Sequence, residues 1–151
     1  MTASPWLPWQ LRWRLLRLRG ADIRSSAIIH GNVIIKSNRL TIGSRVFINS
    51  GVILDNGAGV IIEDDVAIGP GAKIITSTHV IGASTRRASD VTGGRVVIER
   101  GAWIGAAAII LPGVTIARGS VIGAGALVTK DTEPDGLYVG SPARRVRDLA
   151  E

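Results

Sequence analysis

The chain has 151 residues, of which 46% are hydrophobic and 20% charged, proportions typical of one globular domain. It contains no cysteine, which excludes a disulfide framework, a thiolate metal site and a cysteine nucleophile. The formal net charge is +6, but the arginines gather near the two ends of the chain and no nucleic-acid-binding motif accompanies them, so we expect no nucleic-acid partner.

The first expected element is a short amphipathic helix over residues 8–19. Trp9, Trp13 and Leu16 fall on one stripe at helical spacing, with arginines between the apolar residues. The stripe would either cap the open end of the following fold or rest on an anionic membrane through residues 6–19, and we favour the cap. Near the start of the chain, arginines interrupt every apolar run, which does not fit a secretion signal, and no later apolar run is long enough to span a bilayer. We therefore expect a cytoplasmic protein, which would be membrane-associated if the helix binds lipid.

After the helix, an aliphatic residue returns every six positions, and a small or β-branched residue recurs four places after it. The aliphatic positions are Ile29, Ile35, Ile42, Ile48, Leu54, Ile62, Ile68, Ile74, Ile98, Ile104, Ile110, Ile116, Ile122 and Val128. A period of six fits neither a simple strand nor a helix, but it is the period of the hexapeptide β-helix, in which three hexads make one triangular coil. An all-β sandwich is the alternative, and it fits less well because its strands would alternate with a period of two.

Each coil needs tight bends at its corners. Glycine or asparagine follows many of the aliphatic positions, which predicts the bends at Gly43, Asn49, Gly69, Gly105 and Gly123.

The segment IITSTHVIGASTRRASDVTGG, residues 74–94, breaks this rhythm. It contains His79, one of only two histidines, and then the polar pair Arg86 and Arg87. Such a segment cannot add to the aliphatic column, so we expect a flexible loop over residues 80–95 that leaves the coil. Long loops in compact domains usually carry function.

The later motifs AWIG, LPGVTIARG, VIGAGALVTKD and VGSPARR occur in one order and register. Together they resemble the hexapeptide-repeat acyltransferases, in the branch of maltose and galactoside O-acetyltransferases, over residues 25–149. The resemblance implies an all-β, left-handed parallel β-helix that works as a homotrimer. It also implies acetyl-CoA as cosubstrate, no required metal, and sites between subunits that take a carbohydrate or glycoconjugate hydroxyl. We expect a helical arm over residues 1–25, the β-helix over 26–139 with its active-site loop at 80–95, and a coenzyme A-contacting tail over 140–151.

By the same resemblance, His79 is the catalytic histidine at the root of the loop. A neutral imidazole can take the proton of an attacking hydroxyl, and such a base contributes about 10²–10⁴ in rate. An isolated histidine here would otherwise be a surface residue. Asn49 matches a family asparagine near the acceptor, although an asparagine at a corner is also a turn former. His30 lies outside the family motifs and is expected to be structural.

The acceptor-binding residues implied by the resemblance are Asp55, Asn56, Arg86 and Trp103. The family often has an acidic residue where this chain has Asn56, with Asp55 beside it, so the acid is shifted by one residue or acceptor recognition differs. Trp103 resembles a tryptophan that packs beside the catalytic histidine, and a plain corner packer is the alternative.

Coenzyme A would lie along the small residues of the later coils and meet fixed positive charge at the end of the chain. Ala106 has no hydroxyl, so the oxyanion donor there would be a main-chain N–H. For Arg144 and Arg147, a solvated tail is the alternative. The implied cofactor-binding residues are Gly105, Ala106, Gly123, Ala124, Thr129, Lys130, Arg144 and Arg147.

Two other functions remain open. A γ-carbonic-anhydrase-like metalloenzyme would need three histidines per site, whereas this chain has His30 and His79 alone. A non-catalytic β-helix scaffold or binding module is the other alternative.

Overall fold

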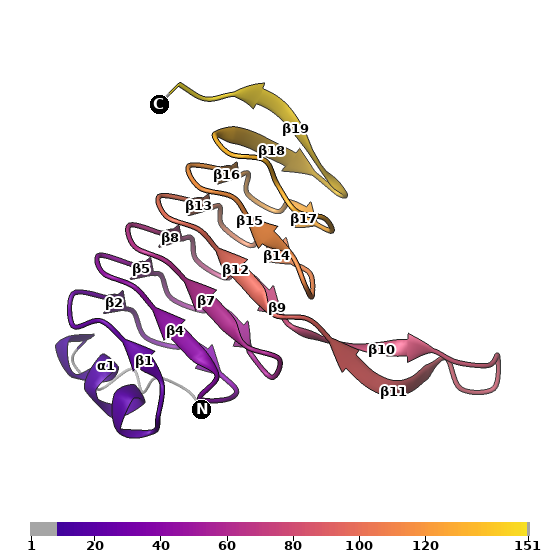
Figure 1. Cartoon of the computed structure of the whole chain (residues 1–151), viewed down its shortest axis with the longest axis horizontal. Helices are drawn as coiled ribbons and strands as arrows, with labels where there is room; N and C mark the ends of the chain where they lie inside the picture. Colours follow the sequence, from indigo (N-terminus) through magenta and orange to yellow (C-terminus); the bar gives the residue numbers. More distant parts are fainter. Residues whose placement is uncertain (1–8, 151) are drawn as a thin grey trace.

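A computed structural model describes residues 9–150. The hexads stack into a triangular tube, with helix α1 at one end and strand β19 at the other, and a long hairpin projects from its side (Figure 1). This is the parallel β-helix that the period of six predicts. Each side of the triangle is a sheet whose strands lie one coil apart.

The three sheets are called the first, second and third faces. The first face contains β1 (Asp22–Ile23), β4 (Leu40–Ile42), β7 (Val60–Ile62), β12 (Val96–Ile98) and β15 (Thr115–Ile116). The second contains β2 (Ile28–Ile29), β5 (Phe47–Ile48), β8 (Ala67–Ile68), β13 (Trp103–Ile104), β16 (Val121–Ile122), β18 (Gly136–Gly140) and β19 (Ala143–Asp148). The third contains β3 (Ile34–Ile35), β6 (Ile53–Asp55), β9 (Lys73–Ile75), β14 (Ile109–Ile110) and β17 (Leu127–Val128).

The core is the predicted aliphatic column. All fourteen repeat positions from Ile29 to Val128 are at most 2% exposed, and the small residues four places later line the same interior. Parallel pairing keeps equivalent positions on top of one another, as in Ile48↔Ile68 and Ile68↔Ile104. Each coil therefore buries its apolar side chains on those of its neighbours.

The corners differ from the prediction. The left-handed backbone falls two residues after the expected positions, for example at Gly71 (φ 69°) and Ala107 (φ 56°) rather than at Gly69 and Gly105. A Cβ on Gly69 would lie 2.7 Å from the backbone nitrogen of Ala106 in the next coil. The residue directly after each aliphatic position is therefore small because the coils stack closely, and the bend comes later.

The predicted flexible loop is instead an ordered β-hairpin. Its strands β10 (Ser77–Ile81) and β11 (Ala88–Gly93) pair antiparallel, with an irregularity between His79 and Ile81. The coil resumes on the next level, where β12 pairs with β7 from Val60↔Val96 onward. The hairpin is thus an insertion that leaves the coil's register unchanged.

Helix α1 (Trp9–Leu18) covers the first coil. Leu16 is buried in the main core and Trp13 packs against it, whereas Leu15 and Leu18 point to solvent. Within residues 9–150 no helix is both long and apolar enough to cross a membrane.

The expected tail is also part of the sheet. β19 (Ala143–Asp148) turns back from β18 (Gly136–Gly140) and pairs with it antiparallel, so the second face extends to Asp148.

Candidate active site

Polar side chains fix the root of the hairpin to the coil below it. The hydroxyl of Thr76, which is fully buried, donates to the carbonyl oxygen of Asp55 (2.6 Å) and accepts from the backbone N–H of Ala58 (3.0 Å). The Ser77 hydroxyl donates to the Asp55 carboxylate (2.6 Å), which also pairs with Lys36 (3.4 Å). Asp55, predicted to bind the acceptor, is 9% exposed and holds the root of the hairpin.

His79 lies on β10, exposed, opposite Val91 of β11. Its Nδ1 is 2.9 Å from the carbonyl oxygen of Ser89. Because a carbonyl oxygen only accepts, this contact requires a proton on Nδ1, and in the neutral ring the lone pair is then on Nε2. The hairpin therefore orients the imidazole through Nδ1.

Five of the other predicted small and polar residues lie on a different edge of the tube. Asn49, Gly105, Ala106, Gly123 and Ala124 follow strands of the second face, at the edge where the chain turns into the third face. His79 follows β9, at the opposite edge of the third face. One copy of the chain therefore does not bring His79 and Ala106 together.

Asn49 acts as a turn former in the chain itself. Its side-chain oxygen accepts from the backbone N–H of Ser50 (2.8 Å).

Trp103 is not a corner packer, because its side chain is 56% exposed on the outside of the second face. It is part of an outward apolar stripe in which successive residues are paired across neighbouring strands. The stripe consists of Ile28, Phe47, Ala67, Trp103, Val121 and Leu137.

Two of the predicted acceptor residues lie elsewhere. Asn56 is fully buried, and its amide oxygen accepts from the N–H groups of Lys36 and Ser37 (3.1 and 2.9 Å). It therefore joins two coils and is not accessible to an acceptor, which corrects the prediction. Arg86 is exposed near the tip of the hairpin, which projects away from the tube (Figure 1), so the chain does not place it beside His79.

A cavity of about 320 Å³ lies at the C-terminal end of the tube. Lys130 and Arg144, predicted to meet coenzyme A phosphates, both line it, together with Tyr138 and Arg145. Thr129 precedes Lys130 and is exposed, and Arg147 is exposed on β19 outside this lining. The lining thus contains three basic side chains of the kind that bind phosphate, and one acidic side chain, Asp131.

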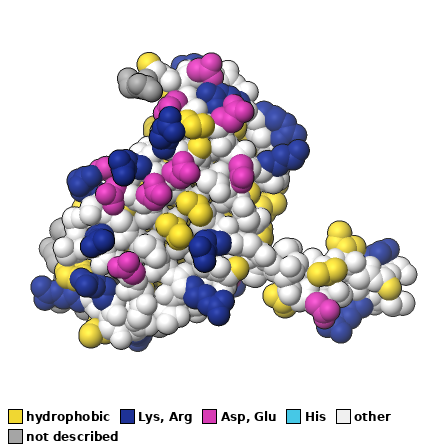
Figure 2. All heavy atoms as spheres, in the orientation of Figure 1, with side chains coloured by type: hydrophobic (Ala, Val, Ile, Leu, Met, Phe, Trp, Pro, Cys, Tyr) yellow, Lys and Arg dark blue, Asp and Glu magenta, His cyan; other side chains and the backbone are white. Residues whose placement is uncertain are grey.

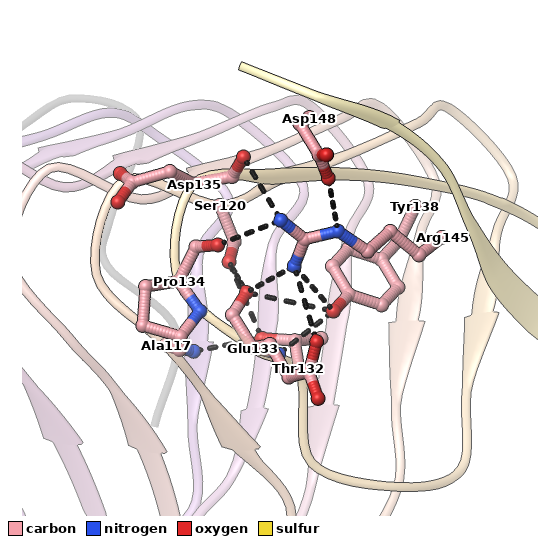
Figure 3. Close-up of polar contacts among 9 residues, drawn as sticks. All are labelled: Ala117, Ser120, Thr132, Glu133, Pro134, Asp135, Tyr138, Arg145 and Asp148. Atoms are coloured by element: carbon pink, nitrogen blue, oxygen red, sulfur yellow. Dashed lines mark hydrogen bonds and ion pairs between the residues drawn. The ribbon is translucent and has the colours of Figure 1, made fainter. Parts of the chain in front are cut away.

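Arg145 was not predicted as a site residue, yet it organises this cavity. Figure 3 shows its guanidinium group directed into the turn before β18. Nε donates to Asp148 (2.8 Å), and Nη2 donates to the carbonyl oxygen of Pro134 (3.1 Å). The hydrogen bond with Tyr138, and after it the one to Asp148, raises the pKa of Arg145 above its usual value. Arg144 and Arg147 pair with β18 as well, so Arg145 differs from them by its side-chain hydrogen bonds to the turn at Pro134 and Asp135.

The part of the chain that the structure describes was compared with the requirements of a metal site. There, no group of three or more His, Asp or Glu side chains is arranged to hold an ion.

Residues 95–130 match the family described as bacterial transferase hexapeptide (six repeats). The chain is 33% identical to a hexapeptide-repeat-containing acetyltransferase of Vibrio cholerae O1 biovar eltor, solved with acetyl coenzyme A, with a TM-score of 0.87 over 96% of this chain and 80% of that one. It is 32% identical to a maltose O-acetyltransferase of Clostridium difficile 630, with a TM-score of 0.84 over 93% and 75% of the two chains.

Among curated proteins, the galactoside O-acetyltransferase of Escherichia coli K12 is 37% identical over 90 residues, or 60% of this chain. The match spans 44% of that relative's length. The identity to the Vibrio cholerae protein over nearly the whole chain shows the family, and the protein belongs to the hexapeptide-repeat acetyltransferases.

Proposed function

We propose that the protein is an O-acetyltransferase that moves an acetyl group from acetyl-CoA to a hydroxyl of a sugar or glycoconjugate, with His79 as general base. The observation that carries this is the 2.9 Å contact from Nδ1 of His79 to the Ser89 carbonyl, which leaves Nε2 to accept a proton. The solved relative with acetyl coenzyme A and the maltose and galactoside O-acetyltransferases support the donor and the acceptor class.

The proposed reaction is a direct transfer. Nε2 of His79 takes the proton of the acceptor hydroxyl while that oxygen bonds to the thioester carbonyl carbon. A main-chain N–H near Ala106 stabilises the resulting oxyanion, a contribution of about 10²–10³ in comparable sites. As the carbon–sulfur bond breaks, the imidazolium returns its proton to the leaving thiolate.

The proposal includes a homotrimer with its sites between copies. His79 and Ala106 stand on opposite edges of the third face, so a second copy has to bring the Ala106 edge to the imidazole. The outward stripe that contains Phe47 and Trp103 supplies an apolar surface of the kind that such contacts cover.

Membrane contact through the N-terminal arm is a further part of the proposal. Leu18 is 84% exposed, Leu15 is 48% exposed, and arginines flank both. This surface fits an anionic bilayer while the opposite side of α1 covers the coil. Co-sedimentation with vesicles that contain an anionic lipid, compared with neutral vesicles, tests it. Residues 6–8 lie outside the described part.

The deciding experiment is the turnover of His79→Ala, measured as thiol release from acetyl-CoA with a panel of sugars. We expect a loss of about 10²–10⁴ in kcat, because the base is removed while the fold is kept. His30→Ala is the matched control, since His30 packs edge-on against Phe47 (5.0 Å between ring centroids) on another coil and should keep near wild-type turnover. Wild-type turnover by His79→Ala would refute the mechanism.

A further inference from the structure

A groove of about 480 Å³ lies on the tube beside the root of the hairpin. Its lining comes from three successive levels of the coil, at the edge between the third and first faces. The lining residues are Asn38, Arg39, Leu40, Thr41, Ala58, Gly59, Val60, Ile61 and Arg95. Its volume is in the range of small-molecule sites.

Two arginines set the charge of this groove. The Arg39 guanidinium donates to the carbonyl oxygen of Gly57 (3.0 Å), which holds it at the edge. The side chain of Arg95 lies across Gly59, where a Cβ would be 3.6 Å from its Nε. None of the described lining residues is acidic, and Figure 2 shows basic side chains on this face near the hairpin. Two guanidinium groups without an acidic neighbour favour a bound oxyanion.

The groove is connected to the hairpin that carries His79. Ala58 in its lining donates to Thr76, and Arg95 follows the end of β11 by two residues. A ligand in the groove therefore lies at the base of the segment that orients the imidazole. The hydroxyl of Thr41 and the amide of Asn38 add groups that can bind sugar hydroxyls.

We propose that the groove lined by Arg39 and Arg95 binds an anionic group of the acceptor, so that the acceptor is a sugar bearing a phosphate or a carboxylate. This rests on the proposed acetyl transfer and narrows its substrate class.

The test measures binding apart from turnover. Glucose 1-phosphate, glucuronate and glucose are titrated into the full chain by calorimetry, with inorganic phosphate as a fourth probe. We expect at least one charged sugar to bind about ten-fold or more tightly than glucose, and its affinity to fall as salt is raised. The two charged sugars separate a phosphate from a carboxylate ligand.

Arg39→Gln and Arg95→Gln should each lower the affinity for that charged sugar by about ten-fold, and the double variant should lower it further. Arg39→Lys and Arg95→Lys keep the charge but lose the planar guanidinium group. Their affinity for the charged sugar should therefore lie between that of the wild type and that of the Gln variants. Arg118→Gln is the control, because Arg118 is exposed, follows β15 at the opposite edge of the first face, and is outside this lining. In turnover, the Gln variants should raise KM for the charged acceptor and leave KM for acetyl-CoA unchanged.

Equal binding of glucose and both charged sugars overturns the inference, and so does wild-type affinity or wild-type acceptor KM in the double variant. If the charged sugar binds through both arginines but the wild-type protein acetylates none of the sugars, the groove stands as an anion site and the proposed transferase function fails instead.

Discussion

Asn56 and His79 show what single side chains do in this fold. Asn56 is buried and its amide makes four hydrogen bonds to the backbone of Lys36, Ser37 and Arg39, so it ties one corner to the next. His79 is exposed and makes a single contact through Nδ1. The first arrangement stabilises the coil, and the second leaves a ring nitrogen for chemistry.

Replacing Asn56 by Ala should therefore destabilise the protein by about 3 kcal/mol. The N–H and the carbonyl of Ser37 lose their partner in Asn56, and the N–H of Lys36 and the carbonyl of Arg39 each lose one of two partners. Urea denaturation followed by circular dichroism measures the change. Asn38→Ala is the control, since Asn38 is exposed on a neighbouring corner. A loss below about 1 kcal/mol for Asn56→Ala would show that water replaces these hydrogen bonds.

At this scale the catalytic role of His79 stays a prediction, whereas the acceptor role predicted for Asn56 is wrong because its side chain is buried. Asn56 and Asp55 are predicted as acceptor residues because the resembled family often has an acidic residue at this position. Which of them points inward depends on the two extra residues before Ile62, where the hexads lose phase. The role of Arg145 depends on contacts with a turn ten residues earlier, which no periodicity encodes.

At the scale of elements, helix α1 has one side packed on the core and another side exposed to solvent. Leu16→Ala should cost about 2–3 kcal/mol, because Leu16 belongs to the buried core. Leu18→Ala should change stability by less than about 0.5 kcal/mol, because Leu18 is 84% exposed. Thermal unfolding of both variants measures the difference, and equal effects would mean that α1 does not cap the coil in solution.

Arg145 links β19 to the turn before β18, in addition to the backbone pairing of the two strands. Arg145→Gln should raise the hydrogen exchange rate of the backbone N–H groups of β19 by about ten-fold, because a guanidinium that joins Asp148, Pro134 and Tyr138 is lost. Arg147→Gln is the control on the same strand. Unchanged exchange in Arg145→Gln would assign the strand's attachment to backbone pairing alone.

The sequence predicts the coil of the β-helix well and the hairpin poorly. The coil was predictable because the same buried position recurs in every hexad, so one pattern is read fourteen times. The hairpin was not, because its strands occur once, are exposed on both sides, and contain apolar residues such as Val80, Ile81 and Val91 without regular alternation.

At the scale of the whole molecule, a site shared between copies makes a sharp prediction. His79→Ala and Ala106→Phe should each be inactive alone, because one lacks the base and the other fills the edge where the donor would lie. Mixed trimers formed by co-expression should recover about a quarter of wild-type activity. Each site needs an intact His79 from one copy and an intact Ala106 from its neighbour, and random assembly brings the two together in about one site in four. Light scattering on the same samples checks the trimer. No recovery in mixed trimers would place the whole site within one chain.

The unbroken pairing of β7 with β12 beneath the hairpin has a consequence for how such proteins diversify. The pairing of the two levels involves no residue of 77–93, so we expect this segment to behave as an exchangeable insertion. Evolution, or an engineer, could exchange that insertion and retune selectivity without rebuilding the scaffold.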